Sequence, residues 1–590
     1  MGPCFLLLAT RSGHSPDRID AVAAREALPG MSLRRLAPRA LLFLDVDAKI
    51  IDPGVPGAIA IGTMFSRDGT RIVADHGVAN PEQLWRRLIA ERWGAFLAIH
   101  VDETSGDICC LRDASSLFPV YVAEVDGMVA VTSDVRLLPA ISGSALRVDW
   151  DGLARHLLCD VLRTARTGLV GVKELLPGQM LSLGEGAGAI SDHWSPWAFC
   201  DSRLEDKQQA VDLVRAAALT SIGAWSACFR HIVLNLSGGL DSSIVAAGLG
   251  HAPTRVTALT LATRAARGDE RLFARMVATH LGVELFEELE SLSDVDLLRS
   301  DAGHLPRPLA RSFAQWGNKV SVAVADQVNA DAFFNGAGGD NVFCSMPSVS
   351  AVADRFLTDW TGIGTIGTAR DMALMSGCGV LDVLIRGAKR AWRRERPYRW
   401  AVNRTFLDPR LFDLVPILFD HPWLQATPRK VLPGKSMHVA WLMGIQNHLE
   451  GFGRELARPV VSPLMSQPLV EACLRIPSWL WCDGGYNRAI AREAFVADLP
   501  AEILRRRSKG SPSSFLISLF EANRKLVGEL LLGGLLMHHQ LLDGDAIEGF
   551  LENGERAQTS AYARIMSLVD IEIWARSWAY RGLPNVAPVR

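Results

Sequence analysis

The sequence lacks the features that would tie the chain to a membrane, a nucleic acid or an oxidising compartment. Its ten cysteines among 590 residues include no C-x-x-C pair, which excludes a disulfide framework and favours free thiols in a reducing compartment. The formal net charge is −2, so the basic excess that attracts nucleic acids or anionic membranes is absent. The longest apolar stretch, Leu526 to Met537, is interrupted by Gly and Glu and is shorter than the roughly 20 residues of a membrane span. The short apolar run near the start follows no basic region, so a signal peptide is not expected. We therefore expect a cytoplasmic protein with no nucleic-acid and no membrane partner.

Positive charge gathers in one place, the stretch from Lys389 to Arg399 (KRAWRRERPYR), where it is mixed with aromatic residues. One interpretation is a solvated helix face. The other is a patch that holds a charged peptide substrate.

The first 195 residues have the pattern of short strands broken by turns. Apolar, β-prone runs alternate with Asp-Gly and Ser-Gly pairs, which are typical turn residues. This pattern predicts a layered antiparallel sheet with a few helices. The expected strands are 40–46, 58–63, 96–101, 121–125 and 129–132.

From residue 205 onward, strands alternate with helices. A helix is expected over 206–224, followed by a strand at 231–236 and a helix at 242–248. A second strand at 255–261, a helix at 269–281 and a third strand at 284–286 follow, and the chain after 350 is mostly helical. Such alternation indicates a parallel α/β sheet. The predicted organisation is an α/β multidomain protein with domains at 1–195 and 205–590.

The most informative motif is the string Leu236 to Ser243 (LSGGLDSS), between a buried strand and a helix. Gly238 and Gly239 let the backbone turn sharply and approach a ligand. The N–H groups at the helix start suit an anion such as pyrophosphate, and Ser237, Ser242 and Ser243 add hydroxyl donors. Asp241 would repel phosphates unless it bound Mg²⁺, which neutralises both. The alternative interpretation is a tight turn whose Asp caps the helix.

This string resembles the pyrophosphate loop of the N-type ATP pyrophosphatases, and the Walker motif G-x-x-x-x-G-K-[ST] is absent. A second string, Phe333 to Phe343, resembles the Gly-rich loop of asparagine synthetase B and its relatives. The resemblance implies ATP and Mg²⁺, with Asp340 as the second Mg²⁺ carboxylate beside Asp241. It also implies that Asn335 and Gly336 lie along the nucleotide and that the backbone of Leu236 and Leu261 recognises adenine.

A third string, Leu499 to Gly510, resembles the family's L-P-x-x-I-x-x-R-x-K segment with one residue inserted. Allowing for the insertion, Arg507 and Lys509 occupy the matched positions. A lysine there would stabilise charge on the α-phosphate and on the tetrahedral oxyanion. The helix with Arg488 and Arg492 fits the same block, whereas the alternative interpretation is a basic helix end.

The N-terminal region resembles the Ntn-type glutaminase domain of asparagine synthetases, an αββα sandwich. The matching segments are 93–96, 112–113, 132–134 and 171–178. That chemistry needs a cysteine directly after the initiator Met, whose free amine acts as base. Here residue 2 is Gly, and the amine of Cys4 is locked in a peptide bond. We therefore expect a degenerate glutaminase domain, with Cys4 as a buried strand residue.

The substrate is indicated by departures from the asparagine synthetase pattern. Ala337 and Asn341 stand where those enzymes carry Glu. The chain looks most like the lasso-peptide macrolactam cyclases in its G-x-G-G-D-N-x-F loop, in the segment 462–469 and in the segment 484–495. The resemblance implies a ligase that adenylates an Asp or Glu side chain of a leader-cleaved peptide and joins it to the N-terminal amine, releasing AMP and pyrophosphate. A partner protease is also implied.

Three points stay open at the level of sequence. The general base is not assigned, and Glu450 and Glu455 are candidates only. The first alternative function is an ammonia-dependent asparagine synthetase. The second is a non-catalytic scaffold for a partner protease.

Overall fold

The structure is a computed structural model of the 590-residue chain. It describes residues 3–580 with these gaps: 11–16, 24–27, 76, 79, 103–104, 185–187, 202–203, 267, 360, 395–397, 399 and 554–557. The expectation for residue 2 therefore lies outside the described residues. Among the described residues, no helix is long and apolar enough to cross a membrane.

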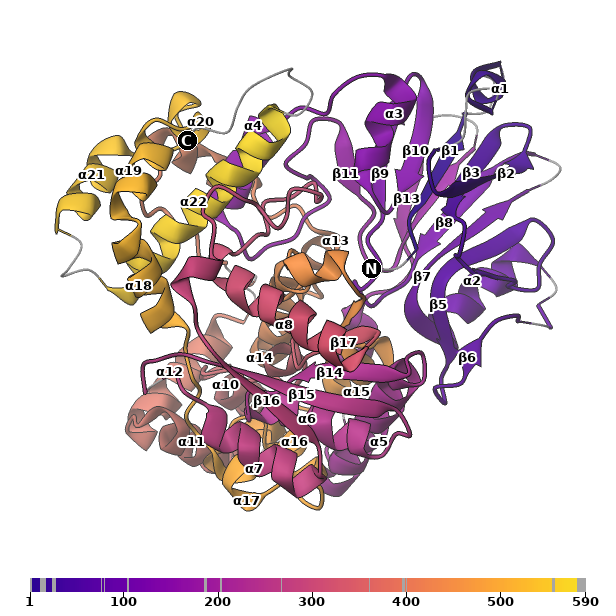
Figure 1. Ribbon diagram of the computed structural model, residues 1–590. Helices are drawn as coiled ribbons and strands as arrows, with labels where there is room; N and C mark the ends of the chain where they lie inside the picture. Colours follow the sequence, from indigo (N-terminus) through magenta and orange to yellow (C-terminus); the bar gives the residue numbers. More distant parts are fainter. Residues whose placement is uncertain are drawn as a thin grey trace.

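The N-terminal part is built on two antiparallel sheets packed face to face (Figure 1). Both inner faces contribute to one buried cluster, in which Phe5 and Leu7 of the first sheet meet Leu97 and Ile99 of the second. This is the layered antiparallel arrangement that the strand pattern predicts. In sheet order, the first sheet is β11 (Val172–Glu174), β9 (Tyr121–Val125), β10 (Met128–Thr132), β1 (Phe5–Ala9), β3 (Ala40–Asp45) and β2 (Met31–Ala37). The second is β13 (Ala189–Asp192), β12 (Gln179–Leu183), β8 (Ile108–Arg112), β7 (Arg92–Val101), β5 (Ala58–Ser66) and β4 (Ile50–Ile51), with β6 (Arg71–Ile72) paired to β5.

Few helices accompany these sheets. Helix α2 packs on β7, and α4 runs beside the C-terminal helices (Figure 1). The helices of this part are α1 (Asp17–Ala23), α2 (Pro81–Ala90), α3 (Leu138–Ser142) and α4 (Trp150–Leu158).

The second part is built on a parallel sheet, which confirms the predicted α/β class. Its strands lie in the order β16 (Glu284–Leu289), β15 (Arg255–Ala262), β14 (His231–Asn235), β17 (Ala332–Phe334) and β18 (Val460–Val461). The third strand is longer than its apolar core predicts, because Glu287 to Leu289 continue the register with β15. The first helices of this part are α5 (Lys207–Ser226), α6 (Leu240–Gly250), α7 (Arg271–Leu281) and α8 (Gln315–Val328).

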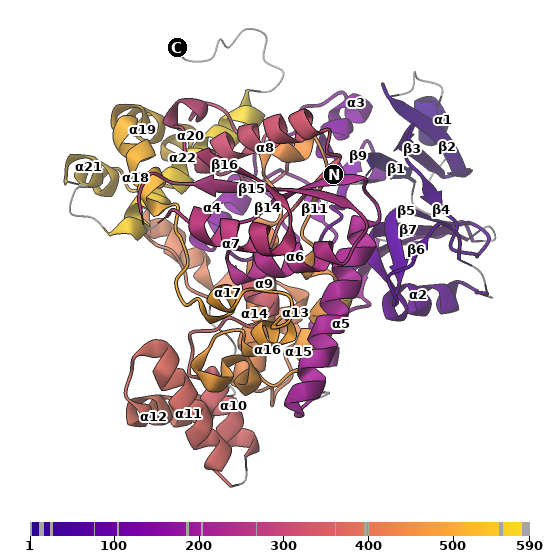
Figure 2. The same ribbon diagram turned by 60° about the horizontal axis from the view of Figure 1, so that its bottom comes forward.

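Beyond residue 338 the chain is mostly helical, as expected, and its helices wrap the sheet and form a group at the edge of the molecule (Figures 1 and 2). They are α9 (Gly339–Val342), α10 (Ser350–Thr358), α11 (Ile363–Ser376), α12 (Val380–Trp392), α13 (Pro422–Gln425), α14 (Pro433–Gly444), α15 (Gln467–Arg475), α16 (Ala489–Ala494), α17 (Ala501–Arg505), α18 (Ser513–Ala522), α19 (Arg524–Leu532), α20 (Leu535–His538), α21 (Gly544–Asn553) and α22 (Thr559–Ala579).

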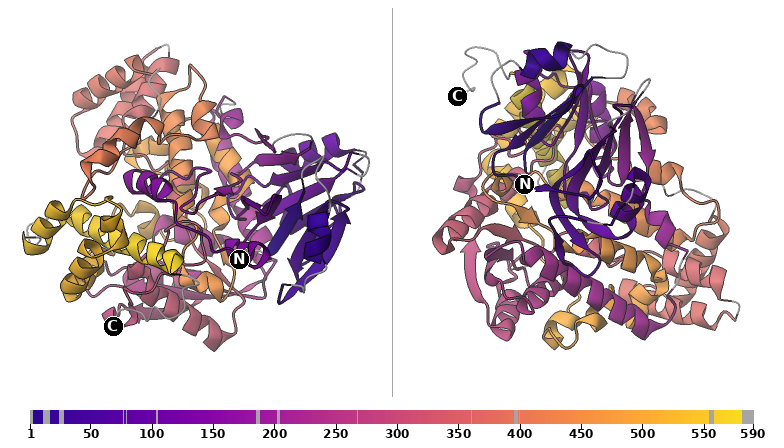
Figure 3. Two further views of the ribbon diagram at one scale, coloured as in Figure 1. Left: turned by 90° about the horizontal axis from the view of Figure 1, so that it is seen from above. Right: turned by 90° about the vertical axis from the view of Figure 1, so that its right-hand side faces the viewer.

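A buried charge cluster joins the two parts, which lie against each other in every view (Figure 3). The carboxylate of Glu174 on β11 is fully buried and accepts from Arg112 of β8 (2.7 Å), Arg163 (2.8 Å) and Arg307 of the second part (3.0 Å). Burial by itself would raise the pKa of Glu174, but the three guanidiniums, led by Arg163, hold that pKa far below its usual range. Arg163 also reaches Glu450 of the second part at 2.6 Å. The residue ranges of the two domains stay a prediction.

Replacing Glu174 with Gln is expected to destabilise the protein by about 3–5 kcal/mol, because it leaves the buried Arg112 and Arg307 without their counter-charge, while Arg163 keeps Glu450. The measurement is the thermal unfolding midpoint. The matched control is Glu82→Gln, which breaks an exposed pair with Arg86 and is expected to cost less than about 1 kcal/mol. Equal midpoints for the two variants would contradict a structural role for the cluster.

Candidate active site

The LSGGLDSS string forms a tight loop between β14 and α6, as its sequence predicts. Gly238 has a φ of +66°, and a Cβ there would lie 2.5 Å from the backbone of Phe273, so only glycine fits. The hydroxyls brace the loop: Ser243 Oγ donates to the Gly239 carbonyl (2.8 Å), and the Ser237 and Ser242 hydroxyls lie 3.1 Å apart. No side chain caps the start of α6. The interpretation of Asp241 as a helix cap is therefore wrong.

The second Gly-rich string folds directly against the first. A Cβ on Gly336 would lie 2.5 Å from the Ser242 amide nitrogen, and one on Gly339 would lie 2.4 Å from Asp241 Cγ. The two strings follow β14 and β17, which are neighbouring parallel strands, so their ends meet at one edge of the sheet. The sequence pattern predicts a loop at Asp340, whereas the structure places it on the short helix α9.

The carboxylates of Asp241 and Asp340 converge on one guanidinium nitrogen. Arg488 Nη1 lies 2.8 Å from Asp241 Oδ2 and 2.7 Å from Asp340 Oδ1. The two oxygens are therefore no farther apart than the sum of those distances. Arg488 sits at the start of α16 with a φ of +56°, a conformation that non-glycine residues rarely adopt and that is common at functional sites.

The third string brings its lysine to the same pair. Lys509 Nζ lies 2.5 Å from Asp340 Oδ2, and about two thirds of its side chain is exposed. Arg506, rather than Arg507, contacts the phosphate loop: it donates to the Gly238 carbonyl (3.1 Å), pairs with Glu270 and stacks over Phe273. Sequence reasoning missed Arg506 and the bridging contact of Arg488, because neither contact leaves a signal in local spacing.

The surroundings of the two carboxylates shift their pKa values in opposite directions. Burial raises the pKa of Asp241 to about 6, against the opposing effect of Arg488. Burial also opposes ionisation of Asp340, but Arg488 and Lys509 lower its pKa below the usual value. Two neighbouring carboxylates with separated pKa values at the edge of a parallel sheet are typical of a functional site.

The residues expected along the nucleotide lie on or directly after three neighbouring strands of the parallel sheet, β14, β15 and β17. Leu236 directly follows β14, and its N–H donates to the Leu259 carbonyl (2.8 Å). Leu261 lies on β15, where a Cβ on Gly317 would lie 2.7 Å from its Cδ1. Asn335 Oδ1 accepts from the Ala337 amide (2.9 Å) and from Ser462 Oγ (2.9 Å), which fixes the backbone before Gly336. Their roles toward a nucleotide stay predictions.

The candidate bases lie elsewhere. Glu450 and Glu455 line a cavity of about 310 Å³ between the two parts, together with Cys4 and His304. Cys4 is half-buried and precedes β1, so the expectation of a buried strand residue is wrong. Its N–H donates to Asp45 Oδ2 (2.6 Å), and burial raises the pKa of its thiol to about 12.

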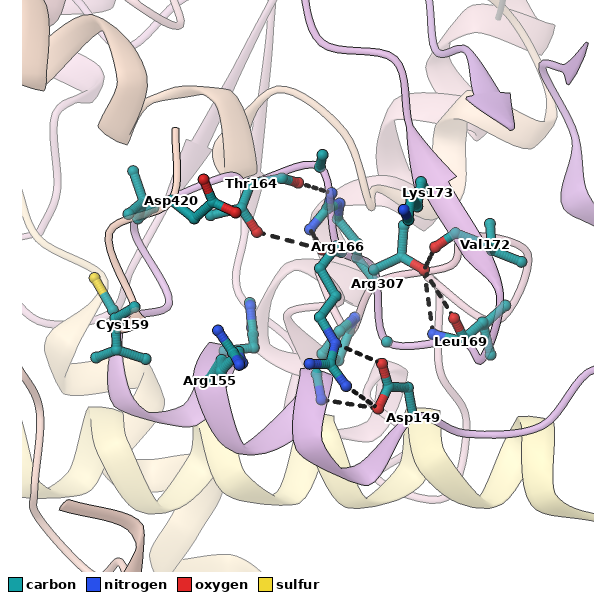
Figure 4. Close-up of a pocket in the computed structure, with 18 of the residues that line it drawn as sticks. Asp149, Arg155, Cys159, Thr164, Arg166, Leu169, Val172, Lys173, Arg307 and Asp420 are labelled. Carbon is teal, nitrogen blue, oxygen red and sulfur yellow. Dashed lines mark hydrogen bonds and ion pairs between the residues drawn. The ribbon is translucent and has the colours of Figure 1, made fainter. Parts of the chain in front are cut away.

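A separate cavity of about 450 Å³ lies beside α4 and is drawn in Figure 4. Two of its basic side chains are engaged: Arg166 pairs with Asp149 at 2.7 Å, and Arg307 reaches Glu174 of the buried cluster. No residue of the phosphate loop, α9 or the Lys509 segment lines it. The cavity is therefore distinct from the candidate site.

Comparison with known proteins assigns most of the second part to one family. The asparagine synthase family model matches residues 229–441 and 458–576. No curated protein matches the chain. Among 27 matching chains of solved structures is one described as the allosteric regulatory enzyme of purine biosynthesis. It shares 8% identity, and the match covers 50% of this chain and 76% of that chain with a TM-score of 0.20, too low to show a shared fold.

Because Glu455 is buried, we expect the free energy of unfolding to depend on pH. Burial, reinforced by Glu450, raises its pKa to about 7, and its Oε1 has no hydrogen-bond partner. An acid whose pKa is raised by folding costs nothing below its unfolded pKa, and its cost grows until pH exceeds the folded pKa. We expect Glu455→Gln to gain on the order of 3 kcal/mol relative to wild type as pH rises from about 4 to 8. The measurement is thermal unfolding across that pH range.

The matched control for this titration is Glu502→Gln, at an exposed glutamate of α17. It is expected to follow the wild-type pH profile. A Glu455→Gln profile parallel to wild type would show that the carboxyl titrates at its ordinary value.

Proposed function

Because the chain belongs to the asparagine synthase family, and is thus an ATP-dependent ligase of the asparagine synthetase kind, we propose that it is an AMP-forming macrolactam synthetase. In this proposal it adenylates an Asp or Glu side chain of a leader-cleaved peptide and closes an isopeptide bond with the peptide's N-terminal amine. The observation that carries the ATP chemistry is the convergence of Asp241, Asp340 and Lys509 beside the phosphate loop.

The donor set fits a divalent cation. Mg²⁺ prefers carboxylate oxygens and keeps its remaining positions for water and phosphate, so two carboxylates suffice. Asp241 and Asp340 already gather around one positive group, Arg488, as they would around a metal. Among the described residues, no group of three or more His, Cys, Asp or Glu side chains could hold a metal ion. When bound, Mg²⁺ would neutralise the departing pyrophosphate.

The chain's own groups divide the remaining work. The N–H groups at the start of α6 bind the pyrophosphate end of ATP. The substrate carboxylate attacks the α-phosphorus and pyrophosphate leaves; the amine then attacks the acyl carbon and AMP leaves. Lys509 stabilises negative charge in both steps, since its exposed ammonium stands beside Asp340. Holding both ends of the peptide together supplies the entropy that ring closure needs.

Two substitutions in α9 and its approach support a peptide over aspartate. Asn341 Nδ2 donates to the Trp441 carbonyl at 2.7 Å, so this side chain fastens α9 to α14 instead of facing a substrate. Ala337 offers only a methyl group. The nitrogen is proposed to come from the substrate itself, because the degenerate glutaminase-like domain, an Ntn-type αββα sandwich in this proposal, holds the Cys4 amine in a peptide bond.

The decisive experiment incubates the protein with ATP, Mg²⁺ and a pool of synthetic peptides that carry a free N-terminal amine and one interior Asp or Glu. The expected product is a peptide lighter by one water, with one AMP per ring. Free asparagine from aspartate and ammonia would identify an asparagine synthetase instead. No AMP from either substrate would favour the scaffold for a partner protease.

Asp340→Asn and Asp241→Asn are each expected to lower the rate of AMP formation by at least about 10²–10³-fold, because each removes a charge on which the nucleotide site depends. Lys509→Met is expected to act by a similar factor on kcat. The control is Asp326→Asn, whose exposed carboxylate pairs with Arg458. AMP formation that survives either Asp substitution would refute the site.

Cys4→Ser is expected to leave AMP formation within about twofold of wild type. Glutamine is expected to give no glutamate with either protein, since a thiol with a pKa near 12 and an acylated amine cannot attack an amide. The assay is glutamate release by amino-acid analysis. Glutamate release that is lost in Cys4→Ser would show that the N-terminal domain is an active glutaminase.

A further inference from the structure

Three helices form an arm that stands away from the rest of the molecule (Figure 2). We call residues 350–394, which hold α10, α11 and α12, the helical arm; Trp360 within it is not described. Eight of the twenty large apolar side chains that are exposed among the described residues belong to this short segment. The most exposed are Ile363 (75%), Leu381 (71%) and Trp392 (91%). Apolar exposure at this density marks an interaction surface.

Three of the four exposed apolar side chains of α12 form one stripe. Leu381, Ile385 and Trp392 lie four and seven residues apart, which places them on the same face of a helix. The opposite face is already used: a Cβ on Gly387 would lie 2.7 Å from Val352 of α10. The outer stripe therefore has no packing role among the described residues.

The arm is held firmly against the second part. Asp354 of α10 is fully buried and accepts from the Gly434 amide (2.7 Å) and from Ser478 Oγ (2.6 Å). Arg355 stacks over Trp479 at 4.8 Å. The exposed stripe is thus presented in a fixed place.

The arm is continuous with the candidate active site. Arg507 Nη1 lies 3.4 Å from the Leu374 carbonyl of α11, and its guanidinium stacks over Tyr486 at 4.6 Å. Two residues further along, Lys509 meets Asp340. The exposed apolar residue Leu374 of the arm therefore lies next to the segment that carries the exposed Lys509.

The arm also differs in charge from the whole protein. Its sequence holds seven basic and four acidic residues, while the complete chain is slightly acidic. Arg386 is paired with Asp382 at 2.9 Å, whereas the basic residues around Trp392 gather at the end of α12. An apolar stripe that ends in positive charge complements an apolar chain that carries carboxylates.

We propose that the helical arm is the docking surface for the peptide substrate, and that this substrate is an apolar peptide with acidic residues beyond the one that is adenylated. The proposal rests on the proposed function. Its occupant is a peptide because the surface runs into the Lys509 segment, where the acceptor carboxylate must arrive.

The test compares wild type with Leu381→Ser, Ile385→Ser and Trp392→Ser in two assays. In the AMP assay with the best peptide of the pool, each variant is expected to raise KM for the peptide about tenfold while kcat and KM for ATP stay within about twofold. In the second assay, fluorescently labelled peptides of the pool are screened directly for binding, and the tightest binder is expected to bind each variant about tenfold more weakly without ATP. The matched control is Val496→Ser, which removes an exposed apolar side chain (66%) outside the arm.

A double-mutant cycle tests whether the basic residues of the arm interact with the carboxylates of the peptide. Lys389→Glu with Arg393→Glu should raise KM for the acidic peptide, and changing the extra carboxylates of the peptide to amides should abolish that difference. Additive effects would overturn the charge argument.

The outcomes separate the two proposals. Arm-dependent peptide binding without any AMP would sink the ligase and keep the docking surface. AMP formation and binding that are unchanged in all arm variants would sink the docking surface and keep the ligase. Arm-dependent sedimentation with phosphatidylglycerol vesicles, or an arm-dependent dimer in sedimentation velocity, with unchanged peptide binding would assign the surface to a membrane or to a second copy.

Discussion

The candidate site depends on holding two carboxylates together at the ends of neighbouring parallel strands. Like charges this close disfavour each other's ionisation, and burial disfavours it further. In this structure the guanidinium of Arg488 resolves the conflict by contacting Asp241 and Asp340 with one nitrogen. The separated pKa values of the two acids follow from their surroundings: Asp241 is nearly buried, whereas Lys509 supports the charge of Asp340 from the solvent side. Any divalent cation bound by this pair takes over a role that arginine now fills.

The same principle operates at the junction of the two parts, with the signs reversed. There one fully buried carboxylate, Glu174, forms ion pairs with three guanidiniums. A buried ion cluster adds less stability than packed apolar residues would, but it is sensitive to geometry, since a misplaced partner leaves an unpaired charge. The cluster therefore links the arrangement of the sandwich to that of the second part through Arg307 and Glu450. That junction also closes the cavity of Cys4 and Glu455, whose acid is left short of partners.

Sequence reasoning predicted the parts of the fold that local pattern determines. Alternating apolar runs predicted the strands of the sandwich. The strand–glycine–helix string predicted a helix from Ser242, whereas α6 begins at Leu240 and holds Asp241 in its first turn. It failed where a role arises from distant contacts. Arg488 lies 247 positions from Asp241, and Arg506 lies 268 positions from Gly238, so no spacing rule joins them. The prediction for Cys4 was also wrong. It was expected to be a buried strand residue, whereas it precedes β1 and its N–H donates to the Asp45 carboxylate.

The position of the Lys509 segment links the chemistry to substrate choice. A ligase that closes rings must bring a flexible chain to a small charged site, and binding on a fixed surface is the physical means of offsetting the lost chain entropy. The arm supplies such a surface because Asp354 and Arg355 anchor it, while Arg507 ties its α11 to the segment that ends in Lys509. An enzyme for free aspartate has no use for an exposed apolar stripe on an arm that is tied to its lysine segment. The exposure of Leu381 and Trp392 therefore argues, independently of Ala337 and Asn341, for a substrate much larger than an amino acid.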